Sequence, residues 1–330
     1  MASNMNKKVE IIGTGSAIPK LRVTNDDLSK MMDTSDEWIS TRTGIKARHL
    51  AVEETTTGMA VEAAKRAMEK ADVSPEEIDL IIAATVSPDR FFPNLSCEIQ
   101  REIGAKQAVA FDINAACSGF LFALNIAATY LKSGVYRTAL ILGAETLSKM
   151  MDWTDRSTCV LFGDGAGAAV VRAKESDGES GILGMLTGSD GAAGMVLHCS
   201  NRPVNNPYVK NDTALSYTYM NGQEVYKFAV RTVPRAITEV VEQAGLSVDE
   251  IDHFLLHQAN YRIIEAAAKR LKQPMEKFPT NLQECGNISA ASVPILLDNV
   301  NREGRLKSGD KIVMAGFGAG LTWGAAVLIW

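Results

Sequence analysis

Short apolar runs, each long enough for one buried strand, alternate along the chain with segments in which apolar residues return every three or four positions. The apolar runs predict strands at residues 80–85, 108–113, 139–143, 168–172, 254–256, 311–315 and 325–329. The helical period predicts helices at residues 59–71, 120–132, 225–243, 261–271 and 294–301. This alternation predicts an α/β fold whose strands are buried on both faces.

The chain also contains an internal repeat. Residues 71–79 match residues 244–252 at a constant offset, and each copy ends a predicted helix and begins a predicted strand. Two shorter matches follow in the same order, residues 131–134 with 306–309 and residues 167–171 with 324–328. The three matches indicate a duplicated fold with halves at 1–175 and 176–330, against the alternative of chance similarity among common residues.

Residues 188–221, rich in Asn, Gly and Ser, interrupt this regular pattern. We expect them to form an irregular surface excursion that covers a site or contacts another chain. The most apolar segment, residues 120–131, contains Asn125 and is too short to span a bilayer. The first residues enter a strand-like run without the apolar stretch of a secretory signal. We therefore expect a cytoplasmic protein that does not bind a membrane.

Composition narrows the possible partners. The 330 residues carry 34 Lys and Arg against 39 Asp and Glu, a net charge of −5, and no basic block stands out, so nucleic acid is not an expected partner. The 5 cysteines are widely spaced and form no Cys-x-x-Cys pair, which fits neither a disulfide framework nor a zinc site. His49, His198 and His253 lack the spacing of metal ligands, so we expect them to be structural or surface residues and expect no metal.

Three polar residues stand where an α/β fold binds ligands, beyond the carboxyl end of a predicted strand. Cys117 precedes a very apolar helix, whose positive end is expected to lower the pKa of the thiol and favour the thiolate. His257 ends the strand at 254–256, and Asn287 follows Gly286. Each has a plainer alternative: an inert buried thiol, a structural histidine and a turn residue. The repeat offset places Cys117 opposite residues 289–292, which predicts that the two helix starts meet.

Three glycine-rich runs, at residues 13–15, 163–167 and 316–320, offer a phosphate-binding alternative. Pro19 follows the first run closely, and the other two lead into strand-like sequence instead of a helix, so the dinucleotide fingerprint fails in its context. We expect these glycines to allow close backbone packing.

Several segments resemble one family of condensing enzymes. Residues 115–120 (AACSGF), 257–260 (HQAN) and 286–294 (GNISAASVP) strongly resemble 3-oxoacyl-acyl-carrier-protein synthase III, which begins type II fatty-acid synthesis. Further segments look like the same family, at residues 33–39, 41–45, 162–168 and 322–324. The resemblance covers nearly the whole chain. It implies a thiolase-like fold, with two pseudo-symmetric halves in five α-β-α-β-α layers, and a homodimer.

The resemblance implies a ping-pong acyltransferase reaction. Cys117 would take an acyl group from acyl-coenzyme A as a thioester, and malonyl-acyl-carrier-protein would lose carbon dioxide and attack it, giving a 3-oxoacyl carrier product. His257 and Asn287 match the pair that donates hydrogen bonds to the malonyl thioester oxygen, each typically worth about 2.7–4 kcal/mol. The backbone N–H groups of Cys117 and Ala319 match an oxyanion hole. Ala319 departs from a glycine of the family, and Leu321 replaces an aromatic residue of some members.

The resemblance also implies binding residues. Trp38 and Arg156 match the pair that sandwiches the adenine of coenzyme A, and Arg42 would lie near its phosphates. Phe92 matches a residue that crosses the dimer and limits the acyl pocket of the partner. The positive positions that dock the acidic carrier protein are Lys227, Arg262 and Lys269, for which a solvated charged face is the alternative. No metal or bound organic cofactor is implied, since the coenzyme A thioester is a substrate.

Other functions remain possible on the motifs alone. A ketosynthase III-like acyltransferase of specialised, polyketide-type metabolism would share them, and a non-catalytic acyl or carrier-protein binder could keep the fold. A thiolase is disfavoured because residues 317–320 supply no second cysteine, and a hydroxymethylglutaryl synthase because its acidic partner is not recognisable. The motifs do not predict the acyl chain, since one or two methylenes change binding by only ~1–3 kcal/mol.

Overall fold

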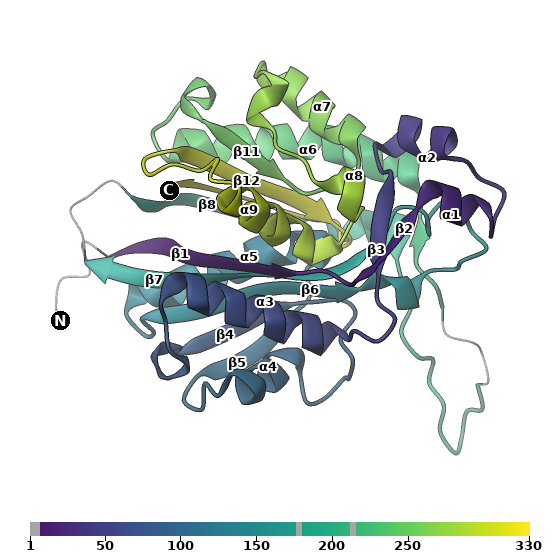
Figure 1. Ribbon diagram of the computed structural model, residues 1–330, viewed down its shortest axis with the longest axis horizontal. Helices are drawn as coiled ribbons and strands as arrows, with labels where there is room; N and C mark the ends of the chain where they lie inside the picture. Colours follow the sequence, from purple (N-terminus) through teal and green to yellow (C-terminus); the bar gives the residue numbers. More distant parts are fainter. Residues whose placement is uncertain (1–6, 176–179, 212–215) are drawn as a thin grey trace.

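The computed structural model describes residues 7–175, 180–211 and 216–330. Its larger sheets lie one above the other (Figure 1). In spatial order, the first sheet contains β1 (Lys7–Ala17), β7 (Asp164–Glu175), β6 (Thr138–Thr146), β4 (Leu80–Ala84) and β5 (Val109–Ile113). In the same way, the second contains β11 (His253–Leu256), β12 (Lys311–Gly318), β13 (Thr322–Ile329) and β8 (Gly181–Ser189).

Helices cover both outer faces and fill the space between the sheets (Figure 1). The outer face of the first sheet carries α3 (Thr56–Ala71) and α4 (Leu95–Ile103), and that of the second carries α6 (Gly222–Gln243) and α7 (Tyr261–Leu271). Between the sheets, α5 (Gly119–Ser133) and α9 (Ser292–Arg302) contact strands of both. This is the five-layer thiolase-like fold, so the predicted fold class is confirmed.

The strands form where the sequence offers continuous apolar runs. All residues of β4 and β6 are buried, and the two strands pair in parallel, as expected of strands covered by helices on both faces. Glycine then lets the layers approach. A Cβ on Gly13 or Gly15 of β1 would come within 2.4 Å of a backbone oxygen of α3, so these glycines serve close packing and the phosphate-loop alternative is wrong for this run.

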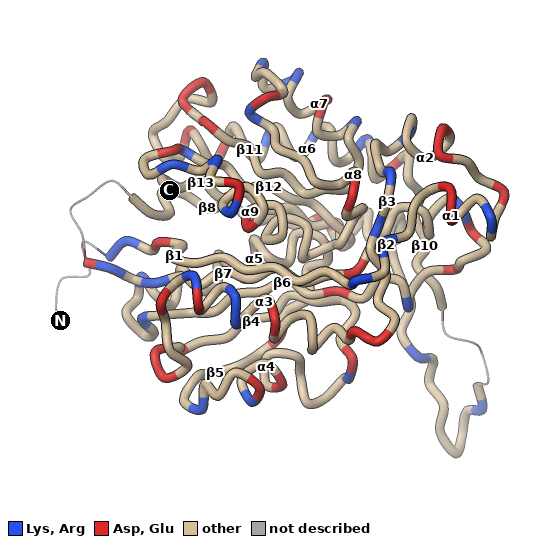
Figure 2. Tube along the Cα trace, in the orientation of Figure 1, with Lys and Arg blue, Asp and Glu red and all other residues tan. Residues whose placement is uncertain are grey.

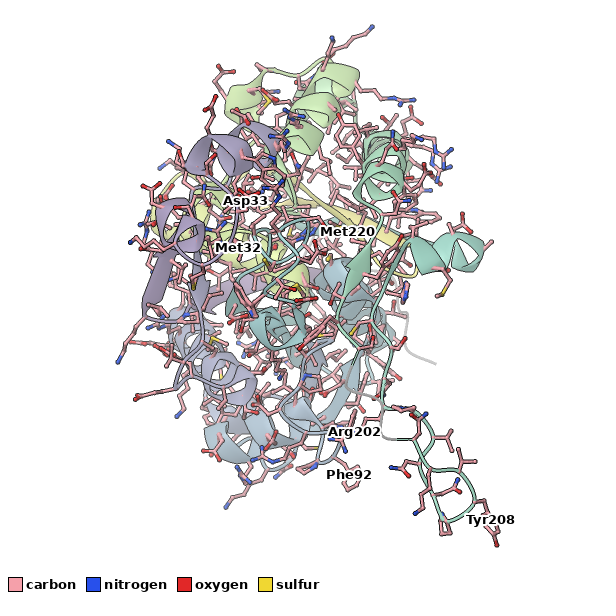
Figure 3. All side chains as sticks on the ribbon, turned by 90° about the vertical axis from the view of Figure 1, so that its right-hand side faces the viewer. Met32, Asp33, Phe92, Arg202, Tyr208 and Met220 are labelled. Carbon is pink, nitrogen blue, oxygen red and sulfur yellow. The ribbon has the colours of Figure 1, made fainter. Side chains whose placement is uncertain are left out.

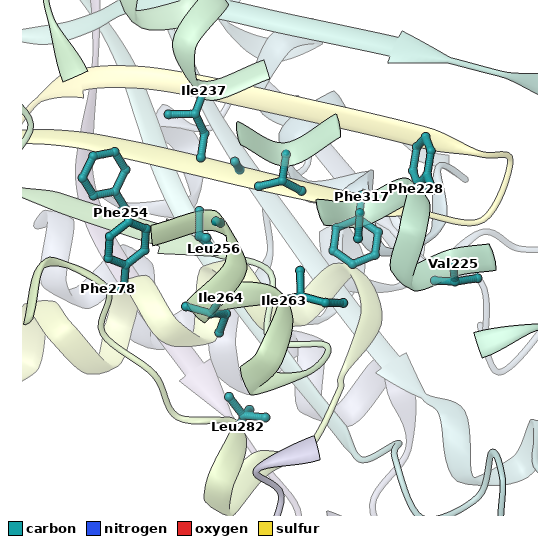
Figure 4. Packing of buried hydrophobic residues seen from close by; sticks show 14 of the residues in the cluster. Val225, Phe228, Ile237, Phe254, Leu256, Ile263, Ile264, Phe278, Leu282 and Phe317 are labelled. Carbon is teal, nitrogen blue, oxygen red and sulfur yellow. The ribbon is translucent and has the colours of Figure 1, made fainter. Parts of the chain in front are cut away.

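Aromatic and aliphatic side chains form the core beneath α6 and α7 (Figure 4). The rings of Phe254 and Phe278 stack with their centroids 4.6 Å apart. Phe228 of α6 meets Phe317 of β12 edge-to-face at 6.4 Å. This packing fixes the end of β12, where Phe317 lies.

The repeat is visible in the hydrogen bonds. Residues 71–79 lead from the last residue of α3 into β4, and residues 244–252 follow α6 directly and lead into β11. Both contain a capping box, formed by Ser74 with Glu77 and by Ser247 with Glu250. The strands of the first sheet all lie within residues 7–175 and those of the second within 181–329. The junction at 176–179 lies outside the described residues, and the division into two halves stays a prediction.

Shorter elements, which the sequence pattern did not predict, surround one end of both sheets. They are β2 (Leu21–Thr24), α1 (Asn25–Ser29), α2 (Asp36–Thr43), β3 (Ala47–Leu50), α8 (Leu282–Cys285), β9 (Leu197–His198) and β10 (Tyr219–Met220). Within residues 188–221, both ends pack against the body, while the described stretch around Tyr208 forms an arm that projects from it (Figure 1 and Figure 3). The expected irregular surface excursion is therefore confirmed. No helix in the described ranges is both long enough and apolar enough to cross a membrane.

Candidate active site

Cys117 lies in the 3₁₀ turn Ala116–Ser118, between the end of β5 and the start of α5. The preceding Ala116 has a φ of 46°, a left-handed conformation that is unusual for a residue with a side chain. Gly119 begins the helix where a Cβ would meet the Ala84 Cβ at 2.7 Å. The close packing at Gly119 and the left-handed turn hold the Cys117 sulfur in a fixed place, with 8% of the residue exposed.

A second turn of the same form, Ser289–Ala291, precedes α9 and contacts the Cys117 turn. Ser289 has a φ of 44°, close to that of Ala116. The prediction that the two helix starts meet is therefore confirmed. The correspondence of Ala116 with Ser289 was available in the sequence, because residues 71 and 244 differ by the same offset.

Asn287 lies just before this second turn. Its backbone forms a parallel bridge with Phe162: the Asn287 N–H donates to Leu161 O at 2.9 Å, and the Gly163 N–H donates to Asn287 O at 3.0 Å. The side-chain oxygen accepts a hydrogen bond from the Ser289 backbone N–H at 2.9 Å. The amide nitrogen is thereby the end of the side chain left to donate to a bound group.

His257 directly follows β11, and its backbone N–H donates to Ala315 O at 2.8 Å. Its ring meets Phe317 edge-to-face, with the centroids 5.4 Å apart. Burial lowers the pKa of His257 to about 3, so the imidazole is neutral near pH 7 and carries a single N–H. The Nδ1 atom has no hydrogen-bond partner among the described residues.

One cavity of about 790 Å³ brings Cys117, His257 and Asn287 together. Gly316, near the end of β12, lies between Cys117 and His257: a Cβ at this position would be 3.5 Å from both the Cys117 carbonyl oxygen and the His257 Cβ. A thiol, a neutral imidazole and an amide therefore line the same cavity, whose largely apolar walls would strengthen hydrogen bonds to developing charge.

The loop after β12 packs on the Cys117 turn. A Cβ on Gly318 would come within 2.6 Å of the Cys117 nitrogen, so glycine is required there. The hydroxyls of Ser118 and Thr322 contact each other at 2.7 Å, and each lies within 3.0 Å of the Ala115 carbonyl oxygen. Ala319 lies in this loop and lines the cavity beside Cys117. These contacts fix the Cys117 turn against the loop that contains Ala319, the two segments whose backbone N–H groups match the oxyanion hole.

The expected ionisation of the Cys117 thiol is wrong in this structure. Burial raises its pKa to about 12, from an ordinary value of 9.0, and the hydrogen bond with Ser289 offsets only part of that rise. The helix start was expected to favour the thiolate, but the depth at which the layers bury the sulfur has the larger effect. The resting group is therefore a thiol.

Aromatic and cationic side chains stand at the mouth of the cavity. Trp38 and Arg42 of α2 line it, and the Arg42 guanidinium lies 4.7 Å from the Trp38 ring centroid. Arg156 does not line the cavity, but its guanidinium lies 5.1 Å from the same ring and hydrogen-bonds to Asp33. The structure thus brings the three proposed coenzyme A residues into one cluster.

Phe92 is not part of this cavity. It is 86% exposed and points away from the body, near Arg202 at the root of the arm (Figure 3). Its neighbour Phe91 lines the cavity instead. The segment that leads into the arm also contributes to the wall, through Gly194 and residues 197–201. His198, which we expected to be a structural or surface residue, is among them.

Lys227 of α6 and Arg262 and Lys269 of α7 are all exposed, on two helices that pack together (Figure 2). Tyr226 and Ile263, the neighbours of the first two, line the cavity, so this surface adjoins the mouth. Three further exposed cations on the same helices were not predicted: Arg231, Arg235 and Arg270. We call these six residues the basic face.

A buried carboxyl near the thiol also escaped the sequence analysis. Glu145 of β6 accepts hydrogen bonds from Thr85, from the Val86 backbone and from Ser87. Burial raises its pKa to about 7, and Ser289 hydrogen-bonds both this carboxyl and Cys117. Its place at the end of a buried strand, as for His257, was the available signal.

Comparisons with known proteins identify the family to which the chain is similar. A family model described as 3-Oxoacyl-[acyl-carrier-protein (ACP)] synthase III matches residues 111–191, and the model of its C-terminal part matches residues 241–330. A protein from Clostridium acetobutylicum named beta-ketoacyl-[acyl-carrier-protein] synthase III is 53% identical, covering 98% of each chain.

Solved structures agree. That of 3-oxoacyl-[acyl-carrier-protein] synthase III from Aquifex aeolicus has a TM-score of 0.91 and 49% identity, covering 98% of this chain and 100% of its own. A priming beta-ketosynthase from the R1128 polyketide pathway also has a TM-score of 0.91, at 38% identity, covering 100% of this chain and 98% of its own. Both the sequence and the fold therefore match over almost the full length, and the chain belongs to the 3-oxoacyl-[acyl-carrier-protein] synthase III family.

Proposed function

We propose that the protein condenses an acyl-coenzyme A starter with malonyl-acyl-carrier-protein, giving 3-oxoacyl-carrier-protein, coenzyme A and carbon dioxide, and so begins type II fatty-acid synthesis. The observation that carries this proposal is the convergence of Cys117, His257 and Asn287 on one cavity. Fatty-acid synthesis is favoured over polyketide priming because the relatives named synthase III share 53% and 49% identity, against 38% for the R1128 enzyme.

In the first half-reaction, the Cys117 sulfur attacks the thioester carbonyl carbon of acyl-coenzyme A. The carbonyl oxygen gains negative charge facing the N–H groups of Cys117 and Ala319, and the bond to the coenzyme A sulfur then breaks. The thiol proton leaves with coenzyme A, so this half-reaction neither releases nor consumes a proton. The raised pKa of Cys117 fits a proton that departs only when the substrate is present.

In the second half-reaction, malonyl-acyl-carrier-protein loses carbon dioxide, and the electron pair of the broken C–C bond forms an enolate. The His257 imidazole, neutral because burial lowers its pKa to about 3, donates to the enolate oxygen together with the Asn287 amide. The enolate carbon attacks the acyl-Cys117 thioester. Cys117 leaves and takes up one proton. These steps need no metal or bound organic cofactor.

Product analysis tests this function. The protein is incubated with acetyl-coenzyme A, then with malonyl-acyl-carrier-protein, and each stage is followed by mass spectrometry. We expect an acetyl adduct on Cys117, then its disappearance as 3-oxobutyryl-carrier-protein forms. A binder without catalysis would leave Cys117 unmodified, and a panel of acyl-coenzyme A thioesters in the first stage would identify the preferred starter.

The adenine of coenzyme A is proposed to bind against Trp38, between the ring and Arg156, with Arg42 toward the phosphates. The cluster of a flat aromatic ring and two guanidinium groups at the cavity mouth supports this, since such groups stack on a base and neutralise phosphate charge. The cavity below the cluster leads to Cys117. We also propose a cytoplasmic location, where coenzyme A thioesters and carrier protein are made.

The basic face is proposed to dock the acidic carrier protein. Replacing Lys227 and Lys269 together by Glu is expected to raise the KM for malonyl-acyl-carrier-protein by about tenfold, because opposite charges steer and hold this partner. Acylation of Cys117 by acetyl-coenzyme A is expected to stay unchanged. Lys106→Glu, an exposed cation beyond α4, is the matched control. Equal KM values in the double variant and the control would argue against docking on this face.

We also propose a homodimer that pairs the β5 edges. β5 ends the first sheet, no other described strand covers its outer edge, and its Val109 is 47% exposed. An uncovered apolar edge is a template for pairing with another strand. Pairing of two copies would cover it and give the exposed Phe92 a cavity of the second copy to enter.

The dimer predicts a specific effect of Phe92→Ala. If Phe92 of one copy limits the acyl pocket of the other, its removal is expected to raise the ratio of hexanoyl to acetyl transfer onto Cys117 by about tenfold. Sedimentation analysis is expected to give a dimer for both the parent protein and the variant. A monomeric parent protein would contradict the proposed assembly. An unchanged ratio in a dimeric variant would contradict the assigned role of Phe92.

A further inference from the structure

Arg48 in β3 is a guanidinium with 0% of its surface exposed. Its hydrogen bonds go to uncharged oxygen atoms: Nη1 donates to Val23 O at 3.3 Å and to Asn25 Oδ1 at 2.8 Å, and Nη2 donates to Val160 O at 2.6 Å. The Nε atom has no hydrogen-bond partner among the described residues. Burial lowers the pKa of Arg48 to about 10, which leaves it a cation near pH 7.

Such a group is costly, because a buried charge loses its hydration and Arg48 receives only the dipoles of carbonyl and amide groups in return. An apolar side chain of similar length would fill this position at less cost. The cost of burying the charge therefore indicates that Arg48 has a role other than stabilising the fold. The segments that Arg48 connects indicate what this role is.

One of these segments, residues 160–163, is hydrogen-bonded to the backbone of Asn287. The Val160 carbonyl, which accepts from Arg48, directly precedes residues 161–163, whose backbone binds Asn287 on both sides at 2.9 and 3.0 Å. Glycine then brings β3 close: a Cβ on Gly163 or Gly286 would lie 3.4 or 3.3 Å from the Arg48 Cβ. Arg48 thus lies against both backbone segments that carry the Asn287 amide.

We propose that Arg48 is a positioning residue for the decarboxylation half-reaction, holding residues 160–163 so that the Asn287 amide points at the enolate oxygen. This inference rests on the proposed role of Asn287. The Asn287 side-chain oxygen is already bound by the Ser289 N–H, so the direction of its amide nitrogen follows its backbone. A donor to developing charge works only within a narrow distance range, and a shift of about 1 Å can cost up to about 100-fold in rate.

Arg48→Met tests the proposal, because it keeps the length of the side chain and removes the charge and all three hydrogen bonds. The two half-reactions are measured separately in the full-length protein: acetyl transfer onto Cys117 by mass spectrometry, and condensation of the preformed acyl-enzyme with malonyl-acyl-carrier-protein. We expect acetyl transfer to change by less than about threefold and condensation to fall at least about tenfold.

Arg48→Lys keeps the charge, but one ammonium group cannot reach all the oxygen partners, so an intermediate loss of condensation is expected. This variant decides the question by the same comparison if Arg48→Met does not fold. Ile78→Ala serves as a control for lowered thermal stability, because Ile78 is buried just before β4, at the end of that strand away from the cavity. This variant is expected to leave the ratio of the two half-reactions unchanged.

The double variant Arg48→Met with Asn287→Ala is expected to condense no more slowly than Asn287→Ala alone, because both changes remove one interaction. Additive losses, a parallel fall of both half-reactions, or unchanged condensation in the Arg48 variants would overturn the positioning role. Wild-type condensation in Asn287→Ala would instead show that the proposed role of Asn287 itself is wrong. The failure of the inference is therefore distinguishable from the failure of the proposed function.

Discussion

Cys117→Ser is expected to abolish acyl transfer, leaving no acetyl adduct on the protein and lowering condensation at least about 1,000-fold. The thiol is buried, and its raised pKa shows that the surroundings do not favour an anion at this position. A hydroxyl gives up its proton far less readily than a thiol, so serine would face the same burial with a poorer nucleophile. Mass spectrometry after exposure to acetyl-coenzyme A, followed by a malonyl-carrier condensation assay, measures both effects.

Cys97→Ser is the matched control for this result. Cys97 is a free, half-buried thiol on α4 that does not line the cavity. We expect the control to keep both the acetyl adduct and full condensation. Condensation at the wild-type rate by Cys117→Ser would rule out the covalent mechanism, even with the fold intact.

Local sequence was sufficient for much of the fold. α7 begins and ends at the predicted residues, Tyr261 and Leu271, because its apolar positions follow one helical face and Asn260 caps it. Other boundaries depend on packing partners. β7 was predicted only for residues 168–172, since Asp164 and the Gly and Ala residues at 165–167 carry little apolar signal. The small residues nevertheless let the strand pass under α9. A Cβ on Gly167 would lie 2.6 Å from the Ile295 nitrogen of that helix.

The candidate site was predictable where topology follows directly from the chain. Strand ends in an α/β fold share one edge, and the internal repeat placed the turn at Cys117 opposite the turn after Asn287. Arg48 could not be found in this way, and for Glu145 the available signal was its position at the end of a buried strand. A charged residue in a short strand or at a strand end normally faces solvent. The burial of these two depends on contacts distant in the sequence, with Val160 beside Arg48 and Val86 beside Glu145.

Burial by segments distant in the sequence also explains why the expected lowering of the Cys117 pKa is wrong. A helix start stabilises an anion by a local effect, which the sequence reveals. Desolvation depends on how completely other layers surround the sulfur, and those layers come from distant parts of the chain: the loop after β12 and the turn before α9 both lie against Cys117. The sign of the pKa shift is therefore set by tertiary packing.

His257→Ala and Asn287→Ala are expected to separate the two half-reactions. Each variant is expected to lower condensation by about 100- to 1,000-fold, because each removes one hydrogen-bond donor to the enolate oxygen. Acetyl transfer onto Cys117 is expected to persist, because the oxyanion of that step faces backbone N–H groups that neither substitution removes. The measurements are the rate of acetyl adduct formation and the release of carbon dioxide from malonyl-acyl-carrier-protein.

Replacement of His257 by Gln gives a sharper version of the same test, since a neutral amide can donate one N–H as the neutral imidazole does. Because burial lowers the pKa of His257 to about 3, the wild-type ring stays uncharged at mildly acidic and neutral pH, and its donor is present throughout. The Gln variant is therefore expected to recover part of the decarboxylation lost in the Ala variant. Its rate relative to the wild type is expected to be the same at mildly acidic and at neutral pH. An Ala variant that also loses acetyl transfer would instead indicate that His257 removes the thiol proton. A loss relative to the wild type that changes between these pH values would contradict a neutral imidazole.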